Sequence, residues 1–392
     1  MNTELIKKNM DNFETPAYFY DMELLKKTLS NIQQITENFG YRVHYALKAN
    51  SNDRILQVIN KHGFGADCVS GNEILKALEN GFSREEIVFA GVGKADWEID
   101  LALDHDIGFF NCESLPEIEV INERAFQKNK KARIALRINP DIDARTHHYI
   151  TTGIEENKFG INREDLPHVV QTCIQLEHIE LKGLHVHIGS QITDMDVFKS
   201  LCLRLNELQD FFRKEHVHLS DINVGGGLGL NYESPESEAI PDFASYFNIF
   251  HTFLDLLPEQ QLHFELGRSV TGHSGVLITK VLYVKEGINT RFAVVDAGMT
   301  EMIRPALYQA YHKISALSTQ KPLKKYDVVG PICESSDYFG KSIQLPELSR
   351  GDILVIHTVG AYGEVMRSNY NLRNHLKFYY SDDFSTSHKY HP

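Results

Sequence analysis

A lysine, a run of glycines and a glutamate each stand at the end of an apolar segment of this 392-residue chain. Lys48 lies in YALKAN, Gly225 to Gly227 lie in NVGGGLG, and Glu265 lies in HFELGR. A buried lysine costs free energy unless it is paired, neutralised or used covalently. Consecutive glycines expose backbone N–H groups that can bind a phosphate, and a carboxylate can keep a pyridine nitrogen protonated. Together these are the features that a pyridoxal phosphate site requires.

Each feature also has a purely structural explanation. The glycines could form a tight turn that needs positive φ. Lys48 could be a surface lysine whose aliphatic stem covers apolar surface, and Glu265 could form an ion pair with Arg268. Taken singly, the residues leave these alternatives open.

Short apolar segments alternate with longer amphipathic segments over the first two thirds of the chain. Helical spacing is clear over 53–62, where Ile55, Val58 and Ile59 recur at i, i+3 and i+4, and over 197–212. Eight strand–helix units in about 230 residues predict an α/β fold, a parallel (β/α)8 barrel of the TIM type, because parallel neighbours need a crossover helix. The predicted strands are 41–48, 65–70, 85–91, 108–114, 133–139, 181–189, 221–227 and 262–267.

The carboxyl ends of these strands determine which residues meet. Catalytic residues of such barrels lie at that edge, and phosphate sites tend to follow the seventh and eighth strands. The glycine run follows the seventh predicted strand, which favours phosphate binding over a simple turn. The residues predicted at this edge are Lys48, Asp67, His187, Gly225 to Gly227, Glu265 and Arg268.

His185 and His187 are two residues apart on a predicted strand, so their side chains face the same side. Barrel hydrolases use this spacing for metal ligation, but they generally carry the pair on the first strand and add ligands at later strand ends. Here the last two strands end in glycines and in Glu-Leu-Gly-Arg, so we predict no metal site. We expect His187 to stack on a flat ring and His185 to be hydrogen-bonded inside the barrel.

The pattern changes after Gly267. From Thr271 onward, strand-like segments alternate with turn residues and show little helical spacing, which predicts an antiparallel β domain. We therefore expect residues 22–270 to form a cofactor-binding barrel and residues 271–392 to form a C-terminal β domain, with a strand from 1–21 added to it.

Composition excludes several classes of partner. The chain has 40 basic and 53 acidic residues, a net charge of −13, and no basic cluster, which argues against nucleic acid and anionic membranes. No apolar stretch is long enough for a secretory signal or a membrane span, so we expect a cytoplasmic protein. Five widely spaced cysteines indicate neither a disulfide framework nor a zinc site.

Eight motifs extend these predictions over nearly the whole chain. They are, in order, YALKAN, GADCVSGNE, HVHIGSQI, NVGGGLG, ELGRS, RPALYQAYH, GPICESSD and GAYG. In this order they resemble the fold-type III pyridoxal-phosphate decarboxylases, and within them the enzymes that convert meso-2,6-diaminopimelate to L-lysine and carbon dioxide, the last step of lysine biosynthesis. The resemblance implies a homodimer with shared active sites that acts on a small amino acid.

The resemblance also implies roles for individual residues. Lys48 would form the Schiff base, His187 would stack on the cofactor ring, and Glu265 would pair with the pyridine nitrogen. Cys333, as proton donor, and Glu334, at the distal ammonium, would enter the active site of a partner subunit. The other implied contacts are Asp67, Ser190, Gly225, Gly226, Gly227, Gly267 and Arg268 with the cofactor, Arg268, Arg304 and Tyr308 with the substrate, and Tyr362 with both.

Two features depart from the family pattern or from ordinary barrel geometry. Leu266 replaces the usual proline between Glu265 and Gly267, for which we expect a small backbone adjustment. The connection 140–162 is long for a strand–helix loop, and we expect it to be a mobile lid.

Other functions are compatible with parts of this pattern. A relative acting on ornithine, arginine or carboxynorspermidine, a racemase, or a non-catalytic pyridoxal phosphate protein would share the barrel, and a metal-dependent hydrolase is a more distant alternative. RPALY and CESSD favour a substrate with a distal carboxylate, and Lys48 and Cys333 are both present, as catalysis requires. Without its acidic and hydroxyl neighbours, Cys333 would be taken for a small buried apolar residue.

Overall fold

The computed structural model describes residues 3–142, 158–317, 321–373 and 376–384. It forms two compact units. One contains residues 29–229 and 242–268, and the other contains residues 1–28, 230–241 and 269–392. The first unit thus begins later than the predicted span 22–270, and it excludes 230–241.

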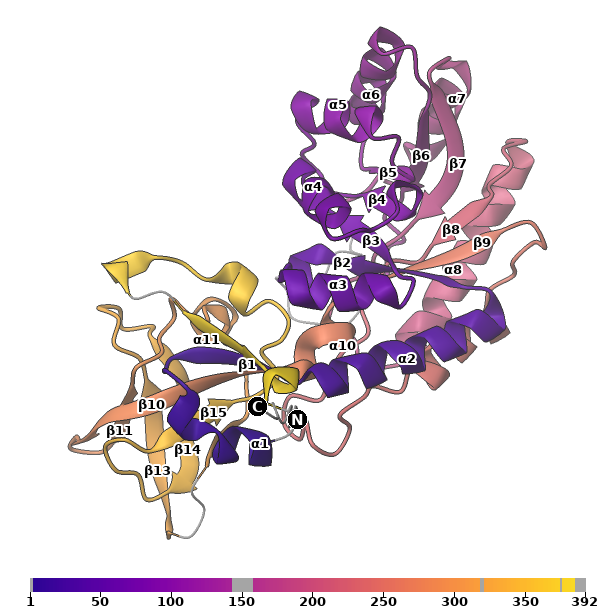
Figure 1. Cartoon of the computed structure of the whole chain (residues 1–392). Coiled ribbons are helices and arrows are strands. Elements are labelled where there is room, and N and C mark those ends of the chain that lie inside the picture. Colours follow the sequence, from indigo (N-terminus) through magenta and orange to yellow (C-terminus); the bar gives the residue numbers. More distant parts are fainter. Residues whose placement is uncertain (1–2, 143–157, 318–320, 374–375, 385–392) are drawn as a thin grey trace, which may run out of the picture. The chain divides into compact units, whose positions relative to one another are not determined.

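The first unit is a closed barrel of eight parallel strands, β2 to β9, which confirms the predicted fold class (Figure 1). The β2–β9 pairing closes it, with Arg42 opposite His263 and His44 opposite Glu265. Its strands are β2 (Arg42–Ala46), β3 (Gly65–Cys68), β4 (Ile87–Phe89), β5 (Phe109–Cys112), β6 (Ala132–Arg137), β7 (Ile179–His185), β8 (Asp221–Asn223) and β9 (Gln261–Leu266).

Helices connect consecutive strands, as parallel pairing requires. Several begin with a polar cap: Asn52, Ser70, Ser114 and Asp242 each accept a hydrogen bond from a backbone N–H in the first turn. The connecting helices are α3 (Asp53–Lys61), α4 (Gly71–Glu79), α5 (Asp96–Asp104), α6 (Leu115–Gln127), α7 (Leu166–Gln175), α8 (Asp196–Lys214) and α9 (Phe243–Phe253), and α2 (Met22–Phe39) precedes β2.

Several strands end earlier than predicted, and this changes where the site residues lie. β2 ends at Ala46, so Lys48 lies in a 3-10 turn, Leu47–Ala49. β7 ends at His185 and β8 ends at Asn223, so His187 and the glycines follow their strands. The positive φ at Gly225 explains the early end of β8, because an extended strand needs negative φ.

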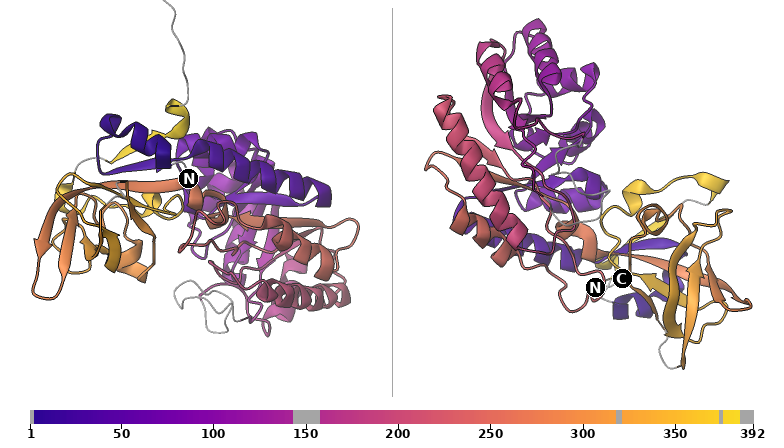
Figure 2. Two further views of the ribbon diagram at one scale, coloured as in Figure 1. Left: turned by 90° about the horizontal axis from the view of Figure 1, so that it is seen from below. Right: turned by 180° about the vertical axis from the view of Figure 1, so that it is seen from behind.

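The second unit is built on an eight-stranded sheet within the described residues. Its strands follow the order β12-β15-β10-β11-β13-β14, and β1 pairs with both β10 and β16. In both views of Figure 2 the indigo strand β1 lies beside the orange strand β10. The strands are β1 (Ala17–Tyr20), β10 (Gly275–Glu286), β11 (Arg291–Val295), β12 (Ile314–Ala316), β13 (Leu323–Val329), β14 (Tyr338–Pro346), β15 (Ile353–Ile356) and β16 (Lys377–Tyr380).

The sequence predicted a wholly antiparallel sheet, but two of its strand pairs are parallel. β11 pairs with β13, and β1 pairs with β16, in parallel. Helix α11 (Arg304–Tyr308) and strand β12 separate β11 from β13, so the chain returns before it enters β13 in the same direction. The other pairs are antiparallel.

Most of the predicted lid, residues 143–157, lies outside the described residues. At its described flanks, Ile138 forms a parallel bridge with Ile161, and the Asn139 N–H donates to the Ile161 carbonyl at 3.0 Å. Within the described part of the chain, no helix is long and apolar enough to cross a membrane.

Candidate active site

Lys48 and Asp67 form an ion pair at the carboxyl edge of the barrel. The Lys48 Nζ lies 2.9 Å from Asp67 Oδ2. The Asp67 side chain is fully buried, whereas 39% of the Lys48 side chain is exposed. Burial raises the pKa of the Asp67 carboxyl, and the Lys48 ammonium opposes this shift only in part. Lys48 is thus held by a buried partner while its side chain remains accessible.

Glu265 is held by donors from three other strands. Its Oε1 accepts from Asn111 Nδ2 at 2.9 Å and from Asn223 Nδ2 at 2.8 Å, and its Oε2 lies 3.2 Å from His185 Nε2. Burial alone would raise the pKa of Glu265, but interactions with His185 and Lys48 outweigh it and hold the pKa below its ordinary value. The carboxylate is therefore ionised in the barrel interior.

The glycine run forms a turn in which side chains would collide with neighbouring strands. Gly225 has a φ of +66° and Gly227 has a φ of +112°. A Cβ on Gly226 would lie 2.0 Å from the Glu265 carbonyl oxygen. The glycines thus form a tight turn, and Gly226 brings this turn close to the backbone of β9. Because glycine has no side chain, the backbone of the turn is uncovered beside Glu265.

His187 interacts with this turn. Its Nδ1 lies 3.3 Å from the Gly226 N–H, which can only donate, so the proton of the neutral ring is on Nε2. Burial lowers the pKa of His187 well below its ordinary value, and the charges on Arg137 and Lys48 add to this shift. His187 is therefore a neutral, flat ring, suited to stacking. Among the described residues, no group of three potential ligands could hold a metal ion.

Ser190 and Arg268 lie together at the same edge. The buried Arg268 donates from Nε to Ser190 Oγ at 3.2 Å. The Ser190 hydroxyl can still donate its own proton to an anion. Gly267 allows β9 to approach the turn after β2, because a Cβ there would lie 3.0 Å from Ala49 Cβ. Leu266, at the position of the usual proline, ends β9 as a buried residue.

The sequence did not indicate a group of buried ion pairs, one of which acts electrostatically on His187. Arg137 Nη1 lies 2.5 Å from Glu113 Oε1, and the Gly160 N–H donates to Glu113 Oε2 at 2.8 Å. Lys94, whose side chain is 1% exposed, lies 2.5 Å from Glu117 Oε1. The Glu113 carboxylate fixes the guanidinium whose charge lowers the pKa of His187.

The second unit brings Arg304, Tyr308 and Tyr362 together. The buried Arg304 begins α11, and its guanidinium carbon lies 5.8 Å from the Tyr308 ring centre and 5.9 Å from the Tyr362 ring centre. Tyr232 and His312, which the sequence did not single out, complete this group. RPALYQAYH contains His312, but nothing in its spacing shows that it contacts Arg304.

Cys333 and Glu334 lie in an exposed turn of the same unit. The buried Asp337 closes this turn by accepting from the Ile332 and Met299 N–H groups, at 2.7 and 2.6 Å. The Tyr370 hydroxyl donates to Glu334 Oε1 at 2.7 Å. The turn thus presents a thiol and a carboxylate to solvent in the single chain.

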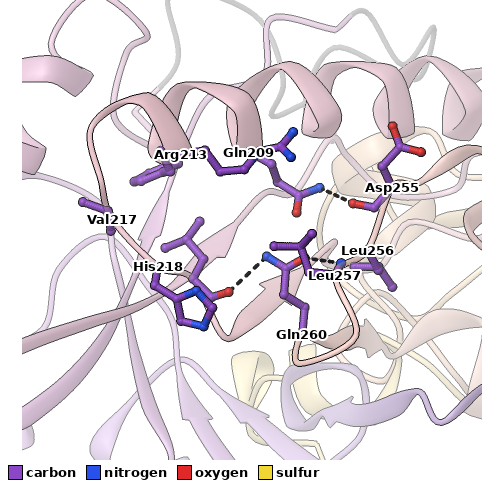
Figure 3. A pocket seen from close by; sticks show the side chains of 10 residues that line it. Gln209, Arg213, Val217, His218, Asp255, Leu256, Leu257 and Gln260 are labelled. Carbon is purple, nitrogen blue, oxygen red and sulfur yellow. Dashed lines mark hydrogen bonds between the residues drawn. The ribbon is translucent and has the colours of Figure 1, made fainter.

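A cavity elsewhere in the barrel does not involve any predicted site residue. It has a volume of about 80 Å³ and lies where the chain enters β8 and β9, at their amino ends (Figure 3). Gln209 donates to the Asp255 carbonyl, and Gln260 donates to the Leu219 carbonyl, both at 3.0 Å. This hydrogen bonding joins the two loops at the edge opposite to Lys48.

Comparison with known proteins gives consistent matches. Residues 25–272 match the family model of the pyridoxal-dependent decarboxylases, pyridoxal binding domain. The chain is 54% identical to diaminopimelate decarboxylase of Bacteroides thetaiotaomicron, over 94% of this chain and 96% of that protein. It is 42% identical to diaminopimelate decarboxylase of Helicobacter pylori strain J99, over 93% of this chain and 89% of that protein.

Solved structures agree with the sequence matches. The crystal structure of diaminopimelate decarboxylase from Helicobacter pylori complexed with L-lysine superposes with a TM-score of 0.86 at 39% identity, over 95% of this chain and 93% of that chain. An arginine decarboxylase from Paramecium bursaria Chlorella virus, at 22% identity, shares the fold with a TM-score of 0.84.

Proposed function

Because the chain belongs to the pyridoxal-dependent decarboxylases, we propose that it removes one α-carboxylate from meso-2,6-diaminopimelate and releases L-lysine and carbon dioxide. We propose a cytoplasmic homodimer as the working form. In it, residues 22–270 bind the cofactor, and residues 271–392, joined by a strand from 1–21, supply substrate-binding residues.

The observation that carries this proposal is the hydrogen bonding of Glu265. Three donors hold it ionised inside the barrel, next to a bare glycine turn and to the Lys48–Asp67 pair. A fixed negative charge in a buried site is what a protonated pyridine nitrogen needs as its partner. A purely structural glutamate would not require an adjacent backbone free of side chains.

The residues present fit pyridoxal phosphate. When bound, this cofactor supplies an electron-accepting ring that takes up the electron pair released with carbon dioxide. Lys48 would hold its aldehyde carbon, His187 would cover the ring, and Glu265 would keep the ring nitrogen protonated. Asp67 would orient Lys48. The phosphate would be held by Ser190, Gly225 to Gly227, Gly267 and the Arg268 backbone.

Cys333 would supply the proton that replaces carbon dioxide at the α-carbon. Its thiol gives up the proton and is reprotonated from water after the product leaves. Because Cys333 and Glu334 are exposed in the single chain, we propose that they enter the active site of the other subunit of the dimer. Exposure of both residues, in a turn closed by the buried Asp337, supports this assignment.

Recognition of the substrate would depend on its second amino-acid head. Arg304 can form two hydrogen bonds with the distal carboxylate, with Tyr308 and Tyr362 beside it, and Glu334 can accept from the distal ammonium. The Arg268 side chain would reach a substrate carboxylate. A substrate without a distal carboxylate would leave the buried Arg304 charge without this ligand, which favours diaminopimelate over ornithine or arginine.

The direct test is carbon dioxide release from meso-diaminopimelate, ornithine, arginine and carboxynorspermidine by the purified holoenzyme. We expect release from diaminopimelate to exceed the others by at least about a hundredfold in kcat/KM, because the lost contacts involve charged groups. Lys48→Ala should abolish release and remove the near-visible absorbance of the bound cofactor. Preference for another amino acid, or retention of that absorbance in Lys48→Ala, would contradict the proposal.

A further inference from the structure

Arg304 lies in a cage formed by Tyr232, Tyr308, Tyr362 and His312. Its guanidinium carbon is 6.0, 5.8 and 5.9 Å from the three tyrosine ring centres. The side chain is buried, and its backbone lies at the first turn of α11, where Pro305 follows. The tyrosines stabilise a cation over their ring faces, but contact with ring faces does not by itself define which edge of the guanidinium points to a ligand.

His312 supplies the directional contact. Arg304 Nε donates to His312 Nε2 at 3.3 Å, and His312 Nδ1 lies 2.9 Å from the His357 carbonyl oxygen. Arginine can only donate and a carbonyl can only accept, so the proton of the neutral imidazole is on Nδ1 and the lone pair is on Nε2. Both ring nitrogens therefore have defined roles, and the Arg304 Nε edge is held toward His312.

The carbonyl that orients His312 is itself fixed. His357 follows β15, and its N–H donates to the Lys313 carbonyl at 2.9 Å, which continues the pairing of β12 with β15. The His357 ring lies 2.7 Å from Ser315 Oγ on β12. Tyr232 packs edge-on against the His312 ring, with centres 5.0 Å apart and an interplanar angle of 89°. The pairing of β12 with β15 therefore fixes the His357 carbonyl, which orients His312, and His312 in turn holds Arg304.

We propose that His312 is a positioning residue that orients the Arg304 guanidinium toward the distal carboxylate of the substrate. This inference rests on the proposed function and deepens it, because it assigns selectivity for the second carboxylate to the pair Arg304 and His312. L-Lysine retains this distal carboxylate after the reaction, whereas pentane-1,5-diamine lacks it. The two compounds therefore separate recognition of the carboxylate from other binding.

Two substitutions separate the two roles of the imidazole. In His312→Asn the amide can replace Nδ1 and donate to the His357 carbonyl, but the acceptor that His312 Nε2 offers to Arg304 Nε is lost. In His312→Gln the longer side chain can place an oxygen near the position of Nε2. We expect His312→Asn to raise the KM for diaminopimelate and the Ki for L-lysine together by about tenfold, as loss of a hydrogen bond to a charged group predicts.

Other readouts should stay constant in the same variant. His312→Asn should change kcat, the cofactor absorbance and inhibition by pentane-1,5-diamine by less than about twofold, and His312→Gln should restore KM to within about threefold. His218→Asn, which alters an exposed histidine at the cavity of Figure 3, is the matched control and should change none of these values.

A double-mutant cycle completes the test. In Arg304→Ala, which already lacks the guanidinium, adding His312→Asn should lower kcat/KM no further. If the losses in kcat/KM add in the double variant, His312 acts independently of Arg304 and the inference is overturned. The inference is also overturned if His312→Asn loses cofactor and diamine inhibition along with diaminopimelate binding, because His312 would then only support the fold. If the wild-type enzyme releases no carbon dioxide from diaminopimelate, the proposed function fails instead, whatever His312 does.

Discussion

The charge of Glu265 depends on its hydrogen-bonding neighbours. Asn111 and Asn223 both donate to one oxygen, and His185 faces the other. His185 lowers the pKa of Glu265 against the effect of burial. A hydrogen bond donated to a carboxylate favours its ionised form, so loss of either asparagine donor should move this pKa upward. The asparagine hydrogen bonds therefore support the negative charge that, in the proposed function, pairs with the ring nitrogen of the cofactor.

The two hydrogen bonds to Glu265 Oε1 predict the effect of Asn111→Ala and Asn223→Ala. Each should lower kcat by about tenfold, as loss of a hydrogen bond to a buried charge predicts. Because a raised pKa leaves more Glu265 protonated at a given pH, the acid side of the kcat–pH profile should move to higher pH. Asn248→Ala, on the exposed face of α9, should leave the profile in place. An unmoved acid limb in both site variants would refute this account of Glu265.

At the scale of elements, the turn after β8 places the glycine backbone, which we propose as the phosphate site, against β9. Gly225 has positive φ, and Gly226 lies where the backbones of the two segments almost touch. Its N–H also donates to His187 Nδ1. The glycine run therefore determines both the path of the turn and the orientation of a ring at the barrel mouth.

Gly226→Ala should consequently disturb cofactor binding more than overall folding. The added Cβ would lie 2.0 Å from the Glu265 carbonyl oxygen, which is a backbone atom and cannot rotate away. We expect at least about a tenfold weaker retention of pyridoxal phosphate, measured by absorbance after dialysis, since such overpacking costs about 1–3 kcal/mol. Gly93→Ala is the control, because Gly93 is exposed and a Cβ there meets nothing within 4 Å. Equal retention in the two variants would contradict this role for the turn.

At the scale of the whole molecule, the proposed dimer makes a quantitative prediction. Lys48→Ala and Cys333→Ala should each be inactive alone. After mixing and subunit exchange, half of the dimers would be mixed, and one of the two sites in each would contain both wild-type residues, so activity should recover to about a quarter of wild type. No recovery, with exchange verified by a tag on one variant, would mean that Cys333 acts within its own chain.

Features that depend on local order could be predicted from the amino-acid sequence. Alternating strand and helix patterns predicted the barrel and its strand order, and the motifs placed Lys48, Asp67, the glycine run and Glu265 at strand ends, where the structure brings Lys48 and Asp67 within 2.9 Å. Periodicity and turn residues are short-range signals, which is why they can be detected in one sequence. The exact ends of β2, β7 and β8 were less predictable, because single backbone angles such as φ of Gly225 decide them.

The convergence of distant side chains could be seen only in the folded chain. Asn111, Asn223 and His185 come from three strands and meet at Glu265, and His312 is joined to Arg304 through a sheet that fixes the His357 carbonyl. The parallel pairing of β11 with β13 is equally non-local. An asparagine or histidine looks the same in a sequence whether it faces solvent or a buried charge, and only strand neighbours, which are set by the closed barrel and the sheet order, distinguish the two.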